Sequence, residues 1–328
     1  MRVLVTGAGG FVAPHLVELL RAEEPGAVLY GTVRPQTSVA RGPGVGITLV
    51  EADLNDPAAA LAVMDEVAPE RIVHLAGQSS VHRSWIEPGA TLRSNVLGLV
   101  NLLDAVRRRG LRPAVLVVGS AEEYGLALPG EIPLHEDTPL RPSSPYAVSK
   151  VAQAALARLY GPAGGMKVVL TRTFHHTGPG RGEAFAESSF ARQIAEIEAG
   201  LRPAVLRVGN LDSVRDYTDV RDVVRAYWML LDRGEDGQVY NVCSGRGRTI
   251  REMLDALLAL SSSRVELRVD PARLRPSDVP ALVGDPARLC AATGWAPRVP
   301  LEQTLGELLT SWRQRVGGAS EFPRKVAE

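Results

Sequence analysis

The stretch SPYAVSK, residues 144–150, places an ionisable phenol and an ammonium four positions apart. Ser144 can cap a helix and Pro145 fits a first turn, so Tyr146 and Lys150 are predicted to be neighbours on one face of a helix start. A phenol ionises near pH 10, and lowering its pKa to about 7 requires roughly 4 kcal/mol of stabilisation of the phenolate. A close ammonium and the positive end of the helix act in that direction. The pair is interpreted as a proton donor with a lowered pKa, and the alternative is a surface contact.

A serine and a glutamate follow a strand-like run in VLVVGSAEEYG, residues 115–125. Ser120 is predicted to lie just past the carboxyl end of the fifth strand, where sheets of this kind bind ligands. Its hydroxyl can then hydrogen-bond the same substrate oxygen that Tyr146 protonates. Glu122 supplies a carboxylate that could act as a general acid or base, and the alternative is a solvated or capping residue.

A glycine-rich turn, TGAGGFVAPHL at residues 6–16, follows the first predicted strand and opens a helix. Gly7, Gly10 and Ala13 occupy the positions of a G-x-x-G-x-x-G/A motif. Glycine lets the backbone approach a pyrophosphate, which the free amides of the helix N-terminus then bind. Because the motif has the required strand–turn–helix context, it predicts a dinucleotide site. The positive charge of a nicotinamide would also favour the phenolate of Tyr146.

The ends of the next two strands indicate which dinucleotide is bound. Sites for NAD usually carry an acid about 20 residues beyond the glycines to bind the ribose 2′-hydroxyl, but this chain has Arg34. A cation suits a 2′-phosphate, so NADP(H) is favoured, with NAD(H) and a merely solvated arginine as alternatives. Asp53, which closes the third strand, is placed either to meet the adenine ring or to cap the helix that starts at Pro57.

Short apolar runs alternate with longer helix-periodic segments up to about Arg172. Runs that are apolar on both faces and separated by helices predict a parallel sheet covered on both sides. The predicted fold class is therefore α/β, a Rossmann-like doubly wound sheet with a smaller mixed α/β C-terminal domain. We place the dinucleotide-binding domain at residues 1–172, with segment 208–242 returning to it, and the substrate domain mainly at residues 173–328.

Composition limits the function further. The chain has 328 residues and a formal net charge of zero, which does not favour capture of nucleic acid or of an anionic membrane. Cys243 and Cys290 lie far apart without metal-like spacing, which favours a reducing compartment. Neither a signal peptide nor a membrane-spanning segment is expected, so we predict a cytoplasmic protein.

The motifs TGAGGFVA, HLAGQSSV and YAVSK, together with Ser120, resemble the extended short-chain dehydrogenase/reductase superfamily in its nucleotide-sugar branch. The resemblance covers almost the whole chain. It implies hydride transfer at a hexose carbon of a nucleoside-diphosphate sugar, with Ser120, Tyr146 and Lys150 as the catalytic set. Lys150 would also hold the nicotinamide ribose. The cofactor site that we assign comprises Gly7, Gly10, Phe11, Val12, Arg34, Asp53, Leu54, Leu75, Ala76, Gly77, Tyr146 and Lys150.

Later motifs, among them HHTGPGRG, RDYTDVRD and RLRPSDVP, resemble GDP-sugar enzymes, above all the reductases of GDP-4-dehydro-6-deoxy-D-mannose. This resemblance implies NADPH-dependent reduction of the C4 ketone to give GDP-D-rhamnose. Arg215 and Arg275 match positions that clamp the diphosphate, a bidentate task suited to guanidinium. Asn210, Asp278 and His175 are further candidates for the substrate site, although His175 replaces the asparagine of the relatives.

Several alternatives follow from the same residues. The related GDP-mannose 4,6-dehydratases have Thr-x-Glu where this chain has Ser120-Ala121-Glu122, so a dehydratase or epimerase with retained cofactor is the second hypothesis. A non-catalytic dinucleotide sensor is a third, disfavoured because Tyr146 and Lys150 are both present. A metal site at His175 and His176 is not expected, because adjacent residues cannot easily face one ion, and one of them is predicted to be structural.

Self-association is a separate prediction. Relatives pair two helices from each subunit into a four-helix bundle, which here corresponds to Thr91–Arg109 and Tyr146–Leu159. The second helix carries more apolar residues than one face on a sheet requires. We therefore predict a homodimer, which sequence cannot distinguish from a tetramer.

Overall fold

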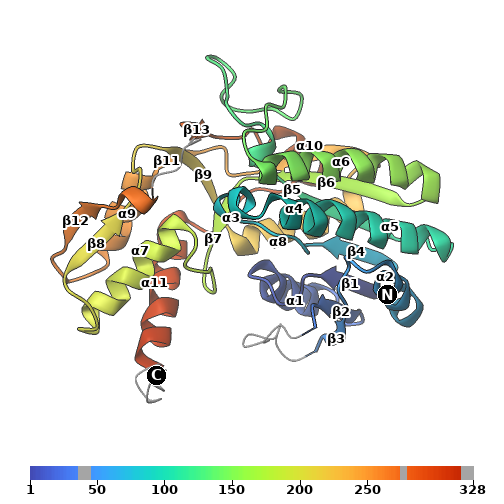
Figure 1. The fold of residues 1–328 in the computed structure, drawn as a ribbon, viewed down its shortest axis with the longest axis horizontal. Helices are drawn as coiled ribbons and strands as arrows, with labels where there is room; N and C mark the ends of the chain where they lie inside the picture. The colour runs from blue at the N-terminus through green and yellow to red at the C-terminus, as the bar shows by residue number, and fades with distance from the viewer. Residues whose placement is uncertain (36–45, 274–278, 319–328) are drawn as a thin grey trace.

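The computed structural model describes residues 1–35, 46–273 and 279–318 of the chain (Figure 1). Its largest element is a parallel sheet with the strand order β10-β6-β5-β4-β1-β2-β3. The order reverses beside β1, because the chain moves outward through β2 and β3 and then returns to β4. The strands of this sheet are β1 (Arg2–Thr6), β2 (Val28–Val33), β3 (Thr48–Glu51), β4 (Arg71–His74), β5 (Ala114–Ser120), β6 (Lys167–Thr173) and β10 (Val239–Val242).

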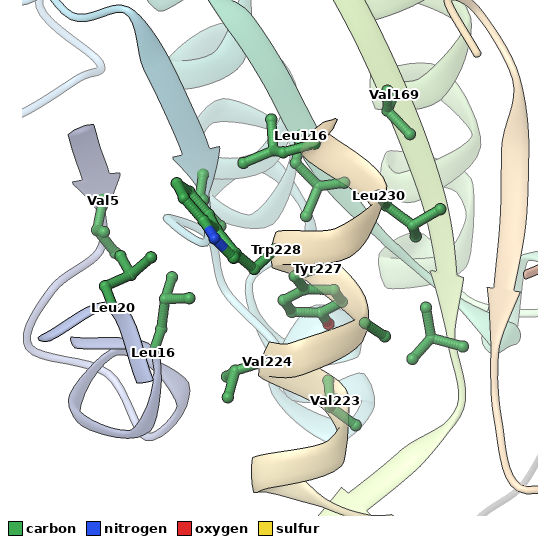
Figure 2. Packing of buried hydrophobic residues seen from close by; sticks show 14 of the residues in the cluster. Val5, Leu16, Leu20, Leu116, Val169, Val223, Val224, Tyr227, Trp228 and Leu230 are labelled. Carbon is green, nitrogen blue, oxygen red and sulfur yellow. The ribbon is translucent and has the colours of Figure 1, made fainter. Parts of the chain in front are cut away.

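Alternate side chains of each strand enter two different hydrophobic clusters, one on each face of the sheet. In β1, Val3 and Val5 pack on one face and Leu4 on the other, all fully buried. Figure 2 shows the first cluster, in which α8 lies across the sheet near Leu116 and Val169. Six of the described helices cover the two faces: α1 (Val12–Glu23), α8 (Val220–Arg233) and α10 (Ala287–Thr293) on one, and α2 (Pro57–Val67), α5 (Gly98–Arg108) and α6 (Pro145–Gly164) on the other.

The predicted start of the helix that carries Tyr146 is confirmed. Ser144 accepts a hydrogen bond from the Ala147 amide at 3.1 Å, and Pro145 occupies the first turn of α6. The helix ends at Gly165, whose φ of +64° is the left-handed conformation common at helix ends. Both ends of α6 are therefore specified by local sequence.

A second group of elements packs on its own hydrophobic cluster beside the sheet, at the left of Figure 1. Strand β9 pairs with β7, β11 and β13, and β8 pairs with β12. Its elements are β7 (His175–Thr177), α7 (Ala186–Glu198), β8 (Val205–Val208), β9 (Val214–Asp219), β11 (Gly247–Thr249), α9 (Ile250–Ala259), β12 (Glu266–Val269), β13 (Ala281–Leu282) and α11 (Leu301–Gly318).

Five short helical segments complete the described elements. Four of them lie between a strand and the next long helix, and the fifth follows β12. They are α3 (Val81–Ile86), α4 (Pro88–Leu92), the π-helical turn η1 (Arg93–Leu97), and the 3₁₀ turns η2 (Ala121–Glu123) and η3 (Pro271–Arg273).

The architecture matches the predicted fold class. Segment 208–242 contributes elements both to the large sheet and to the smaller group beside it. Helix α8 and strand β10 join the large sheet, whereas β9 belongs to the smaller group. The domain boundary at residue 172 stays a prediction. None of the described helices has the length and apolar character needed to cross a lipid bilayer.

Candidate active site

The carboxyl ends of the parallel strands open into a cavity of about 560 Å³. Parts of both the large sheet and the smaller group line it. Thirteen of the predicted site residues lie in its wall: Gly7, Gly10, Phe11, Val12, Leu75, Gly77, Ser120, Glu122, Tyr146, Lys150, His175, Asn210 and Arg215. The reversal of strand order beside β1 produces this opening, as in other doubly wound sheets.

The glycine turn forms a cradle that only glycine can provide. Gly7 has a φ of +70°, and a Cβ atom added there would lie 2.8 Å from the Cα of Ala76. The Gly10 amide donates to the Gly7 carbonyl at 3.0 Å, and no side chain caps the first amides of α1. A close backbone approach with uncapped helix amides fits a dinucleotide pyrophosphate. Ala76 thus backs the turn rather than lining the cavity.

The residues predicted to bind the adenosine end lie outside the cavity wall. Asp53 accepts hydrogen bonds from the Asn55 amide and side chain at 3.0 and 2.9 Å. The alternative interpretation of Asp53 as a helix cap is wrong, because Asp56 caps α2 through the Ala58 amide. Leu54 is buried in the core, and Arg34 is exposed at the end of β2.

Two further predicted residues cannot be placed. Arg275 and Asp278, the proposed second diphosphate clamp and its neighbour, lie outside the described residues. Their part in the substrate site stays a prediction.

Ser120 ends β5 and organises the turn that follows it. Its Oγ accepts from the Glu122 amide at 3.2 Å, while its own amide donates to the Glu123 carboxylate at 2.8 Å. Glu123 is buried and ion-paired with Arg172 at 3.2 Å, and burial raises the pKa of its carboxyl. The capping role considered for Glu122 therefore belongs to Glu123, and Glu122 lines the cavity.

Tyr146 is buried, and its side chain lies beside that of Ser120 in the cavity wall. Burial raises the pKa of Tyr146 to about 12, against the opposing effect of Ser120, and the Glu122 and Glu123 carboxylates raise it further. The expectation that the protein's own groups lower this pKa is wrong. Burial is the largest cause, and the ammonium of Lys150 donates to the Val118 carbonyl at 2.8 Å. Tyr146 is consequently protonated at neutral pH, as a proton donor must be.

Two buried amides that we did not predict hold this constellation. Gln153 accepts a hydrogen bond from Lys150 at 2.9 Å. Asn95, in the π-helical turn η1, donates to the Ser149 hydroxyl at 2.9 Å and accepts from the Gln78 amide at 2.7 Å. It thereby ties the loop after β4 to the residue next to Lys150. Interrupted helices of this type are common at functional sites, but no local sequence signal distinguishes them.

The substrate-side candidates come from the smaller group of elements. The ring of His175 lies 5.5 Å from that of Tyr217, and the buried Arg215 donates to the Val214 carbonyl at 2.9 Å. Asn210 donates to the Ser213 hydroxyl at 3.0 Å. All three predicted residues thus share one wall of the cavity.

His176 has a structural role. Its Nδ1 donates to the Phe174 carbonyl at 3.0 Å and its ring stacks on Phe11 with centroids 6.1 Å apart. Burial lowers the pKa of His176 to about 3, so the ring is neutral. Within the described ranges, no group of three or more His, Cys, Asp or Glu side chains is arranged to hold a metal ion.

Two features together define a class of enzymes. One is a doubly wound sheet with a glycine cradle where its strand order reverses, and the other is a Ser-Tyr-Lys set at a neighbouring strand end. That class is the dinucleotide-dependent short-chain dehydrogenase/reductase enzymes. A model of the GDP-mannose 4,6 dehydratase family matches residues 4–308, so the chain belongs to that family.

Individual relatives include both reductases and dehydratases. GDP-6-deoxy-D-mannose reductase of Pseudomonas aeruginosa is 38% identical over 316 residues, covering 96% of this chain and 98% of that protein. GDP-mannose 4,6-dehydratase of Yersinia enterocolitica is 30% identical, covering 94% and 92%. The structure of RMD from Pseudomonas aeruginosa complexed with NADPH matches with a TM-score of 0.83 and 36% identity, over 96% of this chain and 99% of that one. These similarities confirm the predicted family and fold.

Proposed function

We propose that the protein uses NADPH to reduce the C4 ketone of GDP-4-dehydro-6-deoxy-D-mannose, which gives GDP-D-rhamnose. The observation that carries this proposal is that Tyr146, Ser120 and Lys150 line one cavity together with the glycine cradle and Arg215. The similarity to a GDP-6-deoxy-D-mannose reductase over nearly the whole chain supports the choice of substrate.

The chain's own residues have distinct tasks in this reaction. The bound cofactor supplies the hydride. Tyr146, with a pKa of about 12, keeps its proton at neutral pH, yet a phenol is far more acidic than the alcohol that forms. It therefore donates its proton to the oxygen on which negative charge develops, and the Ser120 hydroxyl donates a hydrogen bond to that same oxygen. The positive charge of Lys150 stabilises the phenolate that remains.

The preference for NADPH rests on two observations. Arg34 is exposed at the end of β2, where the sequence predicts a contact with a 2′-phosphate, and a structure of 36% identity is complexed with NADPH. NAD(H) is the alternative cofactor, because related epimerase structures contain NAD.

A dehydratase is the second candidate, favoured by one specific observation. Glu123 takes the capping role, so the Glu122 carboxylate lies in the cavity wall near Tyr146, where it could act as acid and base in the elimination of water. Relatives named as dehydratases match over most of the chain.

Stoichiometry distinguishes the two candidates. Purified protein is incubated with GDP-4-dehydro-6-deoxy-mannose and NADPH, and separately with GDP-mannose. A reductase consumes one NADPH for each GDP-D-rhamnose formed and leaves GDP-mannose unchanged. Loss of water from GDP-mannose without net change in NADPH would replace the reductase by the dehydratase, and product NMR identifies the C4 configuration.

A homodimer is part of the same proposal. Exposed apolar side chains gather on the neighbouring segments α3, η1 and α6, among them Trp85, Leu97, Val148 and Leu159, each at least 47% exposed. Such a patch suits a second copy of the predicted helix pair, Thr91–Arg109 and Tyr146–Leu159. Sedimentation equilibrium tests it, and a monomer at micromolar concentration would refute it.

The cytoplasm is the compartment that we propose. Cys243 and Cys290 are both free thiols, which suits a reducing environment. Fractionation of cells expressing the protein tests this assignment.

A further inference from the structure

The side chain of Gln153 lies one helical turn beyond Lys150 on α6 and is 1% exposed. Its Oε1 is 2.9 Å from the Lys150 Nζ. An ammonium can only donate hydrogen bonds, so the amide atom that faces it must be the oxygen. The contact is therefore a charge-assisted hydrogen bond in a buried site, where such bonds are strong.

The donors of Lys150 can be accounted for one by one. One N–H is donated to the Val118 carbonyl at 2.8 Å and a second to Gln153. Within the described residues the third N–H has no acceptor, and Lys150 lines the cavity. Two fixed acceptors on β5 and α6 determine the direction of the third donor, because the three N–H bonds of an ammonium are tetrahedrally arranged.

The charged and titratable groups around Lys150 come from three elements. Glu123 of η2 stabilises the ammonium, His74 of β4 is buried and neutral beside it, and Tyr146 lies one turn earlier on α6. None of these three makes a hydrogen bond to Lys150 in the described structure. Gln153 is thus the side chain in direct contact with the amine.

Gln153 is a poor choice for stability alone. Its Nε2 is buried and has no hydrogen-bond partner among the described residues. A buried amide donor without an acceptor destabilises a fold, and an apolar residue of similar size would pack there without that penalty. The presence of an amide at this position is explained by the hydrogen bond that its oxygen accepts from Lys150.

We propose that Gln153 is a positioning residue, whose carbonyl oxygen holds the Lys150 amine in its cationic form and directs its remaining N–H into the cavity. A neutral acceptor stabilises the cation without neutralising it, so the positive charge stays available to Tyr146 and to the cofactor. The expected effect of Gln153 on kcat/KM rests on the proposed function. Its expected effect on NADPH affinity does not, because cofactor binding is measured without the sugar substrate.

The test compares Gln153→Met, which removes the acceptor, with Gln153→Glu, which adds a negative charge. Gln193→Met is the matched control, because Gln193 is also buried but bonds to the Arg207 backbone and the Ser189 hydroxyl instead of to Lys150, and it lies in a different cluster of elements. For each protein, NADPH affinity is measured by fluorescence from about pH 6 to about pH 10, and kcat/KM is measured over the same range.

Wild-type affinity is expected to fall as Lys150 loses its proton, near pH 8. In Gln153→Met that midpoint should fall by about one pH unit, in Gln153→Glu it should rise, and in Gln193→Met it should not move. The inference would be overturned if the affinity midpoints of both Gln153 variants equalled that of the wild type. It would also be overturned if both midpoints shifted in the same direction. If the wild type shows the affinity midpoint but does not reduce the GDP-sugar ketone, the proposed function fails and the role of Gln153 in cofactor binding stands.

Discussion

Replacing Lys150 by methionine should abolish turnover and yet stabilise the fold relative to the wild type at neutral pH. Lys150 is 8% exposed, and burial lowers the pKa of its amine from 10.5 to about 8, with Glu123 opposing the change. Because the folded protein has the lower pKa, the unfolded chain binds more protons between about pH 8 and about pH 10.5. This group therefore destabilises the folded protein below pH 8, and the stability is regained as pH rises through this window.

The size of the effect follows from the two pKa values. At about 1.4 kcal/mol for each pH unit, the fall from 10.5 to about 8 corresponds to about 3 kcal/mol. Between about pH 7 and about pH 9.5 the wild type should recover about 2 kcal/mol of this relative to Lys150→Met, in which the position cannot titrate. Loss of the hydrogen bonds to Val118 and Gln153 affects the variant at both pH values and cancels in the comparison.

Urea denaturation of the wild type and of Lys150→Met at the two pH values, without added nucleotide, measures the change. Lys150→Arg is the control, because guanidinium stays charged throughout, so the difference between the arginine and methionine variants should not depend on pH. A difference in unfolding free energy between the wild type and Lys150→Met that is equal at both pH values would show that the buried ammonium is not destabilised by its surroundings, and the electrostatic reasoning for the site would be wrong.

Three further outcomes are expected. Tyr146→Phe should lower kcat by about 100- to 10,000-fold with NADPH affinity retained, as stopped-flow and fluorescence titration would show; unchanged turnover would contradict its role as proton donor. Ser144→Ala should lower the free energy of unfolding by about 1 kcal/mol in urea, whereas Ser144→Asn should retain it, since asparagine also caps helices; an equal loss in both would contradict the cap. Arg34→Ala should weaken NADPH binding about tenfold or more and leave NADH binding unchanged; an unaltered ratio would identify Arg34 as merely solvated.

Local features of the site were predictable because they depend on neighbours in sequence. Ser144 and Pro145 specify the start of α6 through one side chain and one fixed φ angle. The glycine cradle is recognisable because a left-handed φ at Gly7 and an approach to Ala76 exclude other residues. The parallel sheet was predictable from runs that are apolar on both faces.

Other features depended on contacts between distant segments. The turn after β5 decides which of two adjacent glutamates points inward, and the choice of Glu123 follows from Arg172 on β6. Asn95 lies in a π-helical turn, and the hydroxyl to which it donates a hydrogen bond belongs to Ser149 on α6, 54 residues away. Such pairings cannot be inferred from spacing along one segment, because each requires two elements to have packed already.

The sequence by itself therefore determined the family, the parallel sheet, the glycine cradle and the helix that presents Tyr146 and Lys150 on one face. Only the tertiary structure decided how these two side chains behave. Burial raises the pKa of the phenol and lowers that of the amine, and the amine donates hydrogen bonds to Val118 and Gln153. The physical reason is that helical spacing sets which residues are neighbours, whereas desolvation and hydrogen-bond direction depend on everything that packs around them.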